Sequence, residues 1–383
     1  MTNIEFKYIN WRSVFFLCLL PLVTIYLAVN YLREFGFSWP IFALTVFYYF
    51  ASGLSITGGY HRLFSHRTYE ANTLVRVLYL FFGAGAFQDS VLTWCTDHRY
   101  HHKYTDTEKD PYNAQRGFWF SHMGWMLSLK TPVEEKVGKL LTRDLRKDPW
   151  VMIQHNHYVK IAILSGFIVP ALIGWSWGAP FGAFVFAGLL RVVFVHQYTF
   201  FINSLSHIWG KQTFGNQNSA KDNAFISLFT YGEGYHNFHH HFQNDYRNGI
   251  HWYDYDPTKW IIRFMNTLGM TEKLKKVPEQ EIILAKISQR SKKLELPKNE
   301  IMEQFAPKVE QIKERIDQCA LQLKAMQDEY SRMTKVMKDK RDLQVALLRR
   351  EIKMAKKELR LRYAHWKMLV AQIEKAQLGP LTV

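Results

Sequence analysis

Four apolar stretches stand out in the first 205 residues of the chain. They cover residues 14–31, 39–58, 161–177 and 181–205. As helices, all four fall within the length range that crosses a hydrocarbon core about 30 Å thick. We therefore predict an all-α membrane protein with four transmembrane helices.

A fifth apolar stretch, residues 77–88, is only twelve residues long and lies between Arg76 and Asp89. Runs of this length are typical of re-entrant or interfacial segments, so we predict that it does not span. Thirteen Lys or Arg residues lie within 61–157, whereas the connections 34–38 and 178–180 contain none. Because basic loops stay in the cytosol, we place both termini and the large loop there.

From Thr271 onward the pattern changes to that of amphipathic helices. Apolar residues alternate steps of four and three at Phe305, Val309, Ile312, Ile316, Cys319, Leu323, Met326, Tyr330, Met333 and Met337. This is a heptad seam, and a second one, out of step with the first, runs from Val345 to Ile373. Either one helix absorbs a skip residue or the chain folds back near 338–342 into an antiparallel hairpin.

These patterns divide the chain into two parts. We predict a membrane domain at 1–270, with a cytosolic helical cap formed by 59–157 and 206–270, and a coiled-coil-like tail at 271–383. The tail is expected to be an oligomerisation or docking element, which makes a homo-oligomer one expected assembly. The alternative is a platform for a regulator or an electron donor.

The net charge of +16 is distributed unevenly, with the tail carrying more than half of the basic residues in fewer than a third of the positions. The tail holds 26 of the 49 basic and 16 of the 33 acidic residues. No aromatic residues interleave a basic patch, so we expect no nucleic-acid partner. A basic cytosolic tail is better explained by anionic membrane lipid. The three cysteines form no C-x-x-C pair, which argues against a disulfide framework and a thiolate metal site.

Nine of the sixteen histidines fall in four clusters, each beside a membrane segment on the predicted cytosolic side. They are His61 and His66; His98, His101 and His102; His207, four residues after Asn203; and His236, His239 and His240. Residues three or four apart share a helix face, so the last three clusters are expected to chelate. His61 and His66 are five apart, about 140° around an ideal α-helix, and are expected to straddle two ions.

Imidazole is the commonest protein metal ligand, and nine imidazoles exceed the needs of one ion. We therefore predict a helical di-metal cap. Glu233, Asp97 and Asp222 are candidate partners that orient ligand imidazoles through their other ring nitrogen.

The segments that contain these histidines resemble those of a known family. The segments GYHRLFSHR, DHRYHHKYTDTEKDPY, NSLSH and GEGYHNFHHHF resemble those of the integral-membrane fatty-acyl desaturases of the stearoyl-type Δ9 group, and INSLSHIWG and WYDYDPTKW resemble its bacterial branch. The resemblance implies that the nine clustered histidines bind two irons and that Asn203 reaches one iron through water. It also implies a bacterial inner-membrane location.

The implied reaction uses O₂, two electrons and two protons to place a cis double bond in a saturated C16–C18 acyl chain, releasing two waters. Unactivated C–H bonds require an activated oxygen species, which redox-inert zinc cannot supply. Zinc nevertheless binds such ligands more tightly than ferrous iron, so overexpressed protein can hold zinc in place of iron. The sequence has neither a complete G-x-G-x-x-G nor an HPGG haem-domain motif, which implies a separate electron donor and reductase.

Five further residues match substrate positions of the resembled family. Tyr49 and Gly53, four apart on the second span, correspond to the closed end of the acyl tunnel. Gln88, Trp94 and Lys130 correspond to the head-group end. Asp89 and Thr96 differ from the residues that contact coenzyme A in animal relatives, so an acyl-lipid substrate is the alternative to acyl-CoA.

Two other functions fit parts of the pattern. A His-box membrane hydroxylase would share the ligands but form an alcohol instead of a double bond. A membrane-anchored coiled-coil scaffold would depend on the tail and not on His101.

Overall fold

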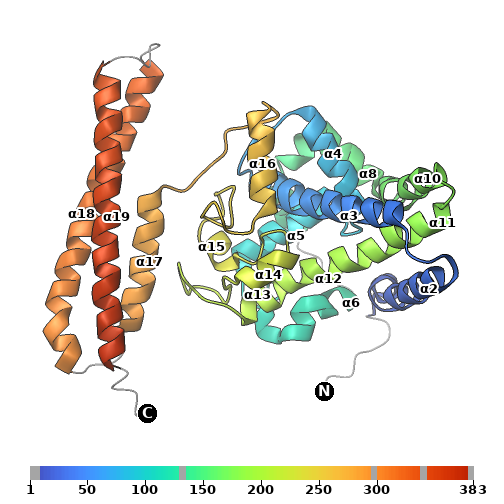
Figure 1. The fold of residues 1–383 in the computed structure, drawn as a ribbon, viewed down its shortest axis with the longest axis horizontal. Coiled ribbons are helices and arrows are strands. Elements are labelled where there is room, and N and C mark those ends of the chain that lie inside the picture. The colour runs from blue at the N-terminus through green and yellow to red at the C-terminus, as the bar shows by residue number, and fades with distance from the viewer. Residues whose placement is uncertain (1–8, 129–134, 295–299, 337–342, 378–383) are drawn as a thin grey trace. The chain divides into compact units, whose positions relative to one another are not determined.

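The computed structural model describes residues 9–128, 135–294, 300–336 and 343–377. The chain divides into two compact units (Figure 1). The membrane unit consists of Met1–Gln212 with Asn216–Lys276, and the tail unit of Thr213–Gly215 with Val277–Val383.

Four helices of the membrane unit are long and apolar enough to cross a membrane. They are built from α1 (Trp11–Val14), η2 (Phe15–Leu19) and α2 (Leu20–Phe35); α3 (Trp39–Leu54) and η3 (Ser55–Ser65); α9 (Tyr158–Ile163), η7 (Leu164–Ile168) and α10 (Val169–Trp175); and α11 (Pro180–Ala183), η8 (Phe184–Leu190), α12 (Arg191–Asn203) and α13 (Leu205–Ile208). The all-α class is confirmed, and each of the four predicted spans largely coincides with one of these candidate helices. The second and fourth helices continue past their apolar runs, and these extensions carry His61 and His207.

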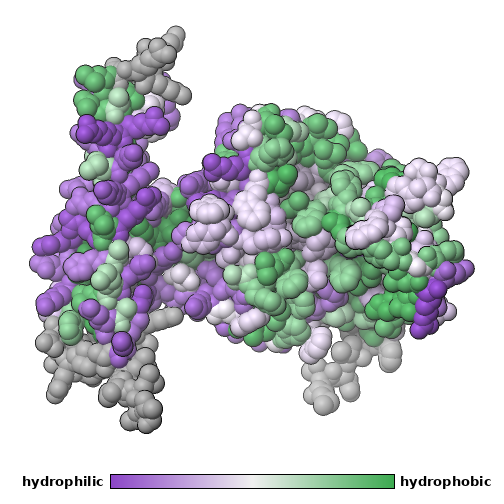
Figure 2. All heavy atoms as spheres, viewed as in Figure 1, coloured by the Kyte–Doolittle hydropathy of each residue, from purple (hydrophilic) through white to green (hydrophobic). Residues whose placement is uncertain are grey.

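The surface of the membrane unit agrees with this assignment. Leu22, Trp39 and Leu172 on three of these helices are more than half exposed, which is unfavourable in water and favourable in lipid. Figure 2 shows apolar residues spread over the visible face of the membrane unit, whereas the visible surface of the tail unit is mainly hydrophilic.

Shorter helices complete the membrane unit. They are α4 (Thr73–Ala84), α5 (Val91–Tyr104), η4 (Ala114–Arg116), η5 (Phe120–Gly124), α6 (Trp125–Leu127), α7 (Glu135–Leu141), η6 (Leu145–Lys147), α8 (Pro149–Asn156), α14 (Ala224–Phe229), α15 (His236–His241) and α16 (Pro257–Thr267). Strand β1 (Glu70–Ala71) pairs antiparallel with β2 (Thr271–Glu272). The fifth apolar stretch falls largely on α4, whose twelve residues are too few to span.

Side-chain caps fix where the helices around the histidines begin. Asn72 accepts from the main-chain N–H of Val75 at the start of α4. Ser90 does the same for Thr93 at the start of α5. Such caps satisfy N–H groups that have no partner inside the helix. The α5 cap therefore sets the register of the helix that carries His98, His101 and His102.

In its described residues, the tail unit contains three helices, α17 (Glu279–Leu294), α18 (Glu300–Val336) and α19 (Leu343–Gln377). α18 and α19 run antiparallel (Figure 1), and Ile316 and Leu323 from the first seam share a core with Leu359 and Trp366 from the second. Of the two alternatives for the tail, the hairpin is therefore the one that forms. Its expected turn, residues 338–342, lies outside the described residues. α17 adds Ile283 and Ile287 to the core, which the heptad pattern did not indicate.

Candidate metal centre

The nine clustered histidines converge on two points in the membrane unit. One group consists of His61, His66, His98, His102 and His239, and the other of His101, His207, His236 and His240. Within each group, one ring nitrogen of every histidine lies within 4.8 Å of those of the others. The four sequence clusters thus interleave, because α5 and α15 each contribute ligands to both groups.

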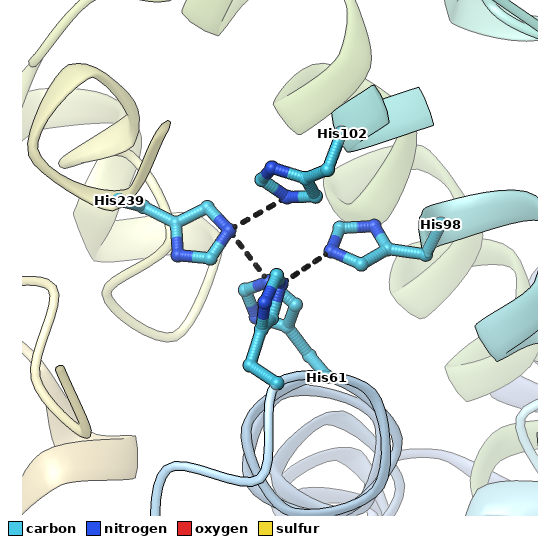
Figure 3. Close-up of side chains that lie close together, drawn as sticks. His61, His98, His102 and His239 are labelled. Atoms are coloured by element: carbon cyan, nitrogen blue, oxygen red, sulfur yellow. Dashed lines mark hydrogen bonds between the residues drawn. The ribbon is translucent and has the colours of Figure 1, made fainter. Parts of the chain in front are cut away.

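In the five-histidine group the Nε2 atoms face one another (Figure 3). The Nε2 atom of His239 lies 3.0 Å from Nε2 of His61 and 3.0 Å from Nε2 of His102. The Nε2 atoms of His66 and His98 are 2.8 Å apart. The group therefore gathers imidazoles from η3, α5 and α15 around one centre.

The four-histidine group is built in the same way. The Nε2 atom of His240 lies 3.1 Å from Nε2 of His236 and 3.4 Å from Nε2 of His101. The His207 ring approaches from α13, with its centroid 4.9 Å from that of His236. All four residues are buried.

The placement of His61 and His66 differs from the prediction. Both belong to the five-histidine group, because the second span ends in a π-helical segment and not in an α-helix. In a π-helix the N–H bonds five residues back, and here His66 N–H donates to the His61 carbonyl over 3.0 Å. Residues five apart therefore share a face, so the expectation that this pair straddles two ions was wrong.

Carboxylates hold several of these imidazoles from the outside. His61 Nδ1 donates to Glu233 Oε2 over 2.9 Å, as predicted for Glu233. His101 Nδ1 donates to Asp110 over 2.8 Å, and His207 Nδ1 lies 2.7 Å from the hydroxyl of Ser219, which itself donates to Asp106. Asp106 and Asp110 were not predicted; both lie in the loop after α5, inside the motif that carries the family resemblance.

The other two predicted carboxylates are placed differently. Asp222 accepts from the main-chain N–H of Phe238 over 2.9 Å, so it fixes the backbone of α15 between His236 and His239. Asp97 lies on the wall of the adjacent cavity. The hydrogen bonds described for Asp222 act on the histidines through the backbone.

Glu233 is itself embedded in a buried charge cluster. It accepts from Arg62 over 2.8 Å and from the side-chain amide of Asn248 over 2.6 Å, and Arg62 also pairs with Asp256. Burial alone would raise the Glu233 pKa, but Arg62 and His61 outweigh it and lower the pKa to about 2. Glu233 is thus ionised and holds the Nδ1 proton of His61.

The donor set fits metal ions. Burial, with a contribution from neighbouring histidines, lowers the pKa well below its usual value for His66, His98, His102, His236, His239 and His240. Neutral imidazole with its Nδ1 proton held by a carboxylate presents a bare Nε2, the form that ligates metal. An imidazole nitrogen offers either one N–H or one lone pair, so His239 Nε2 makes one good hydrogen bond and cannot satisfy both His61 and His102. A cation at the centre resolves this conflict.

A cavity of about 960 Å³ opens beside both groups. His61 and His98 from one group and His101 and His236 from the other lie on its wall. Asn203, Gln88 and Trp94 also line it, and the Trp94 ring stacks on His98 with centroids 4.8 Å apart. Two of the predicted substrate residues therefore lie where a ligand in this cavity would touch them.

The remaining substrate positions lie elsewhere. Tyr49 and Gly53 both contact Tyr231: the rings of the two tyrosines are 5.0 Å apart, and a Cβ at Gly53 would come within 2.0 Å of the Tyr231 ring. Neither is among the residues that line the cavity, whose nearest wall on the same helix is Ile56. Lys130 lies outside the described residues. The roles of these three residues remain predictions.

Comparisons with known proteins agree with this geometry. Residues 37–266 match the fatty acid desaturase family. Acyl-CoA desaturase 1 of Saccharomyces cerevisiae is 42% identical over 296 residues, which cover 77% of this chain and 57% of the yeast protein. Stearoyl-CoA desaturase 5 of Bos taurus is 37% identical over 278 residues, which cover 72% of this chain and 82% of the bovine protein.

The human stearoyl-CoA desaturase is 38% identical over 278 residues, which cover 71% of this chain and 76% of the human protein. The chain spans less than two thirds of the length of the Saccharomyces cerevisiae protein and of the probable acyl-CoA desaturase of Schizosaccharomyces pombe. These relatives are fungal and mammalian, so the assignment to the bacterial branch stays a prediction. With both histidine groups inside the matched region, the chain belongs to the fatty acid desaturase family.

Proposed function

We propose that this protein is an O₂-dependent fatty acyl desaturase that places a cis double bond, at Δ9, in a saturated C16–C18 acyl chain carried by coenzyme A. The observation that carries the proposal is the pair of buried histidine groups on the wall of one large cavity. The names of the relatives support an acyl-CoA substrate. An acyl-lipid substrate is the alternative.

Two iron ions would occupy the two groups. The five-histidine group would hold one, and the four-histidine group would hold the other, with Asn203 contributing through water. The iron pair would supply the activated oxygen that breaks unactivated C–H bonds. Nine imidazole ligands would also accept zinc, so metal content depends on how the protein is produced.

The protein's own residues bind, orient and protect. Glu233 and Asp110 hold the Nδ1 protons of His61 and His101, which keeps both Nε2 atoms aimed at their group. Most of the surface of the cavity wall is apolar, with Ile56, Phe87 and Trp94 among its members, so it suits an alkyl chain. Positioning of this kind is a large part of what a protein contributes to catalysis.

Partners and location complete the proposal. Electrons would come from a separate donor and its reductase, and the basic cytosolic face would favour an acidic carrier. The orientation with both termini in the cytosol, the bacterial inner membrane, contact with anionic lipid and a homo-oligomer formed through the tail are proposed from the sequence patterns above.

The test is the fatty-acid profile of host cells expressing the wild-type chain, His101→Ala and His241→Ala, with double bonds located by mass spectrometry. His241 follows the ligands His239 and His240 but is exposed, which makes it a matched control. We expect a new cis monoene in wild-type and His241→Ala cells and none with His101→Ala.

Two other results would contradict the proposal. A hydroxylated acyl chain would identify a His-box hydroxylase. A function that survives His101→Ala but requires residues 271–383 would identify a scaffold.

A further inference from the structure

The loop between α4 and α5 forms part of the cavity wall in an unfavourable backbone conformation. Phe87 and Asp89 have φ angles of +55° and +72°, in the left-handed region that side chains other than glycine's rarely adopt. Both residues, and Gln88 between them, line the cavity. Backbone of this kind persists only where its surroundings hold it, and it concentrates at functional sites.

Side chains from the third and fourth spans form hydrogen bonds with four of the five residues 85–89 of this loop. Arg191 donates to the Gly85 carbonyl over 2.5 Å, and His196 Nε2 donates to the Ala86 carbonyl over 2.8 Å. The Gln88 side chain donates to Thr199 Oγ1 over 2.9 Å. From the other side, Tyr158 Oη accepts from the Asp89 N–H over 3.0 Å.

Phe87, the remaining residue of the loop, is held by ring packing. The Phe87 ring stacks on Phe167 of η7, with centroids 4.6 Å apart. Residues 85–89 therefore have a defined partner at every position, and three of the five partners come from α12. The strained conformation is a consequence of how the two spans present these groups.

Arg191 is an unusual residue for this task. It is fully buried within a helix that is apolar enough to span a membrane. Besides Gly85, it donates to the Ala187 carbonyl, the Ser52 hydroxyl and the Gly166 carbonyl, over 2.9 to 3.1 Å. In the described part of the chain, the acceptors it contacts are thus carbonyls and a hydroxyl from four elements.

A charged side chain in a membrane span is costly, so it is a functional candidate by default. Helix packing alone would be served at lower cost by an apolar side chain of similar size. What Arg191 adds is a fixed point for the loop, since its guanidinium joins the Gly85 carbonyl to α3 and η7.

The loop shares its cavity with His98 and His101, one from each histidine group. The walls of a cavity decide which methylene of a bound acyl chain lies beside the metals. We propose that Arg191 and His196 are positioning residues, which hold the wall at 85–89 and thereby fix the position of the double bond. This inference rests on the proposed desaturase function.

The experiment compares His196→Leu with His196→Gln, because only glutamine keeps a donor for the Ala86 carbonyl. Double-bond positions in the monoenes of expressing cells are the readout. We expect His196→Leu to yield neighbouring positional isomers, with roughly a tenfold loss of discrimination between adjacent carbons, since small misplacements have large effects on reaction geometry. His196→Gln is expected to retain one isomer, and Arg191→Lys to fall between the two.

His122→Leu is the matched control. His122 is also a buried histidine of the membrane unit, but it lies within hydrogen-bond distance of Ser204 and Gln197 and not of the loop. We expect this variant to give a single isomer whatever its yield. If His196→Leu does not accumulate, Tyr158→Phe, at another residue of the cavity wall, keeps the ring and removes the acceptor for the Asp89 N–H, and should give the same mixture of isomers.

A second readout does not depend on catalysis. Hydrogen–deuterium exchange of residues 85–90 in the purified chain should be faster in His196→Leu than in wild type and unchanged in His122→Leu. A wild-type chain that forms no monoene would overturn the proposed function. A wild-type chain and a folded His196→Leu variant that form the same single isomer would overturn this inference alone.

Discussion

The two units bury different kinds of side chain. The interior of the membrane unit holds Arg62, Arg191, Glu233 and Asp256 together with the histidine groups. The tail unit is packed mainly with apolar residues in heptad register, such as Ile316, Leu323 and Trp366. Buried polar groups are costly unless each has a partner, whereas apolar packing stabilises without such conditions. The difference places the candidate chemistry in the membrane unit, because among the described residues only that unit gathers buried charges around its histidines.

The largest effect is expected from Arg62→Met in the membrane unit. This change leaves Glu233 and Asp256 buried without their cation, a situation that typically costs about 3–5 kcal/mol. We expect a lower thermal midpoint and little folded protein by size-exclusion chromatography in detergent. Arg67→Met is the control, because the Arg67 side chain is 66% exposed and its ion pair with Asp144 is long. Equal loss in both variants would contradict a special role for the buried cluster.

Trp366→Ala tests the apolar core of the tail unit. Trp366 is fully buried in the tail core, and removing a buried Trp usually costs about 3–5 kcal/mol. We expect the tail unit to become sensitive to protease while the monoene yield stays unchanged. Met368→Ala, two residues further on and 64% exposed, should leave both unchanged. Loss of the product along with the tail would show that the tail contributes to activity.

The buried charges of the membrane unit should also make its stability depend on pH. The Glu233 pKa is lowered from 4.5 to about 2, so its ionised form stabilises the fold above pH 4.5, and this contribution is lost as the pH falls from 4.5 toward 2. A shift of this size corresponds to about 3 kcal/mol. Chemical unfolding of metal-free wild type and Glu233→Gln should therefore show stabilities that converge as the pH falls through this window. A constant difference would contradict the assignment.

The smallest expected effect is on metal affinity. Asp110→Asn keeps the size of the side chain but weakens the partner of His101 Nδ1. Replacing such partners usually lowers metal affinity 10–100-fold. Competition with a chelator should strip metal from the four-histidine group first, while the five-histidine group, which Asp110 does not contact, keeps its ion. Uniform loss from both groups would indicate a general weakening of the fold.

The sequence predicted the parts of the structure that depend on composition along the chain. The spans followed from apolar length, and the gathering of the histidines followed from four clusters beside membrane segments. The hairpin remained one of two options because a frame shift between seams fits both. The helical pattern from Thr271 onward covered α17, but no heptad seam indicated that Ile283 and Ile287 would join the tail core.

The remaining features depend on tertiary structure. The spacing of His61 and His66 does not reveal the π-helical end of the second span. On an α-helix, residues five apart lie on different faces, so the spacing indicated two separate ions. Asp110 reaches His101 only because the loop after α5 turns back on it. Arg191 is a charge within an apolar run of the sequence, and three of its four acceptors, on Ser52, Gly85 and Gly166, come from segments far from it in the chain.

We expect the two histidine groups to hold one iron each. The measurement that decides this is the iron content per chain after loading, by plasma mass spectrometry on wild type and on a His236→Ala/His240→Ala variant. We predict two irons per wild-type chain and one in the variant, which retains the five-histidine group. One iron in the wild type, or two in the variant, would show that the two groups do not each hold one iron.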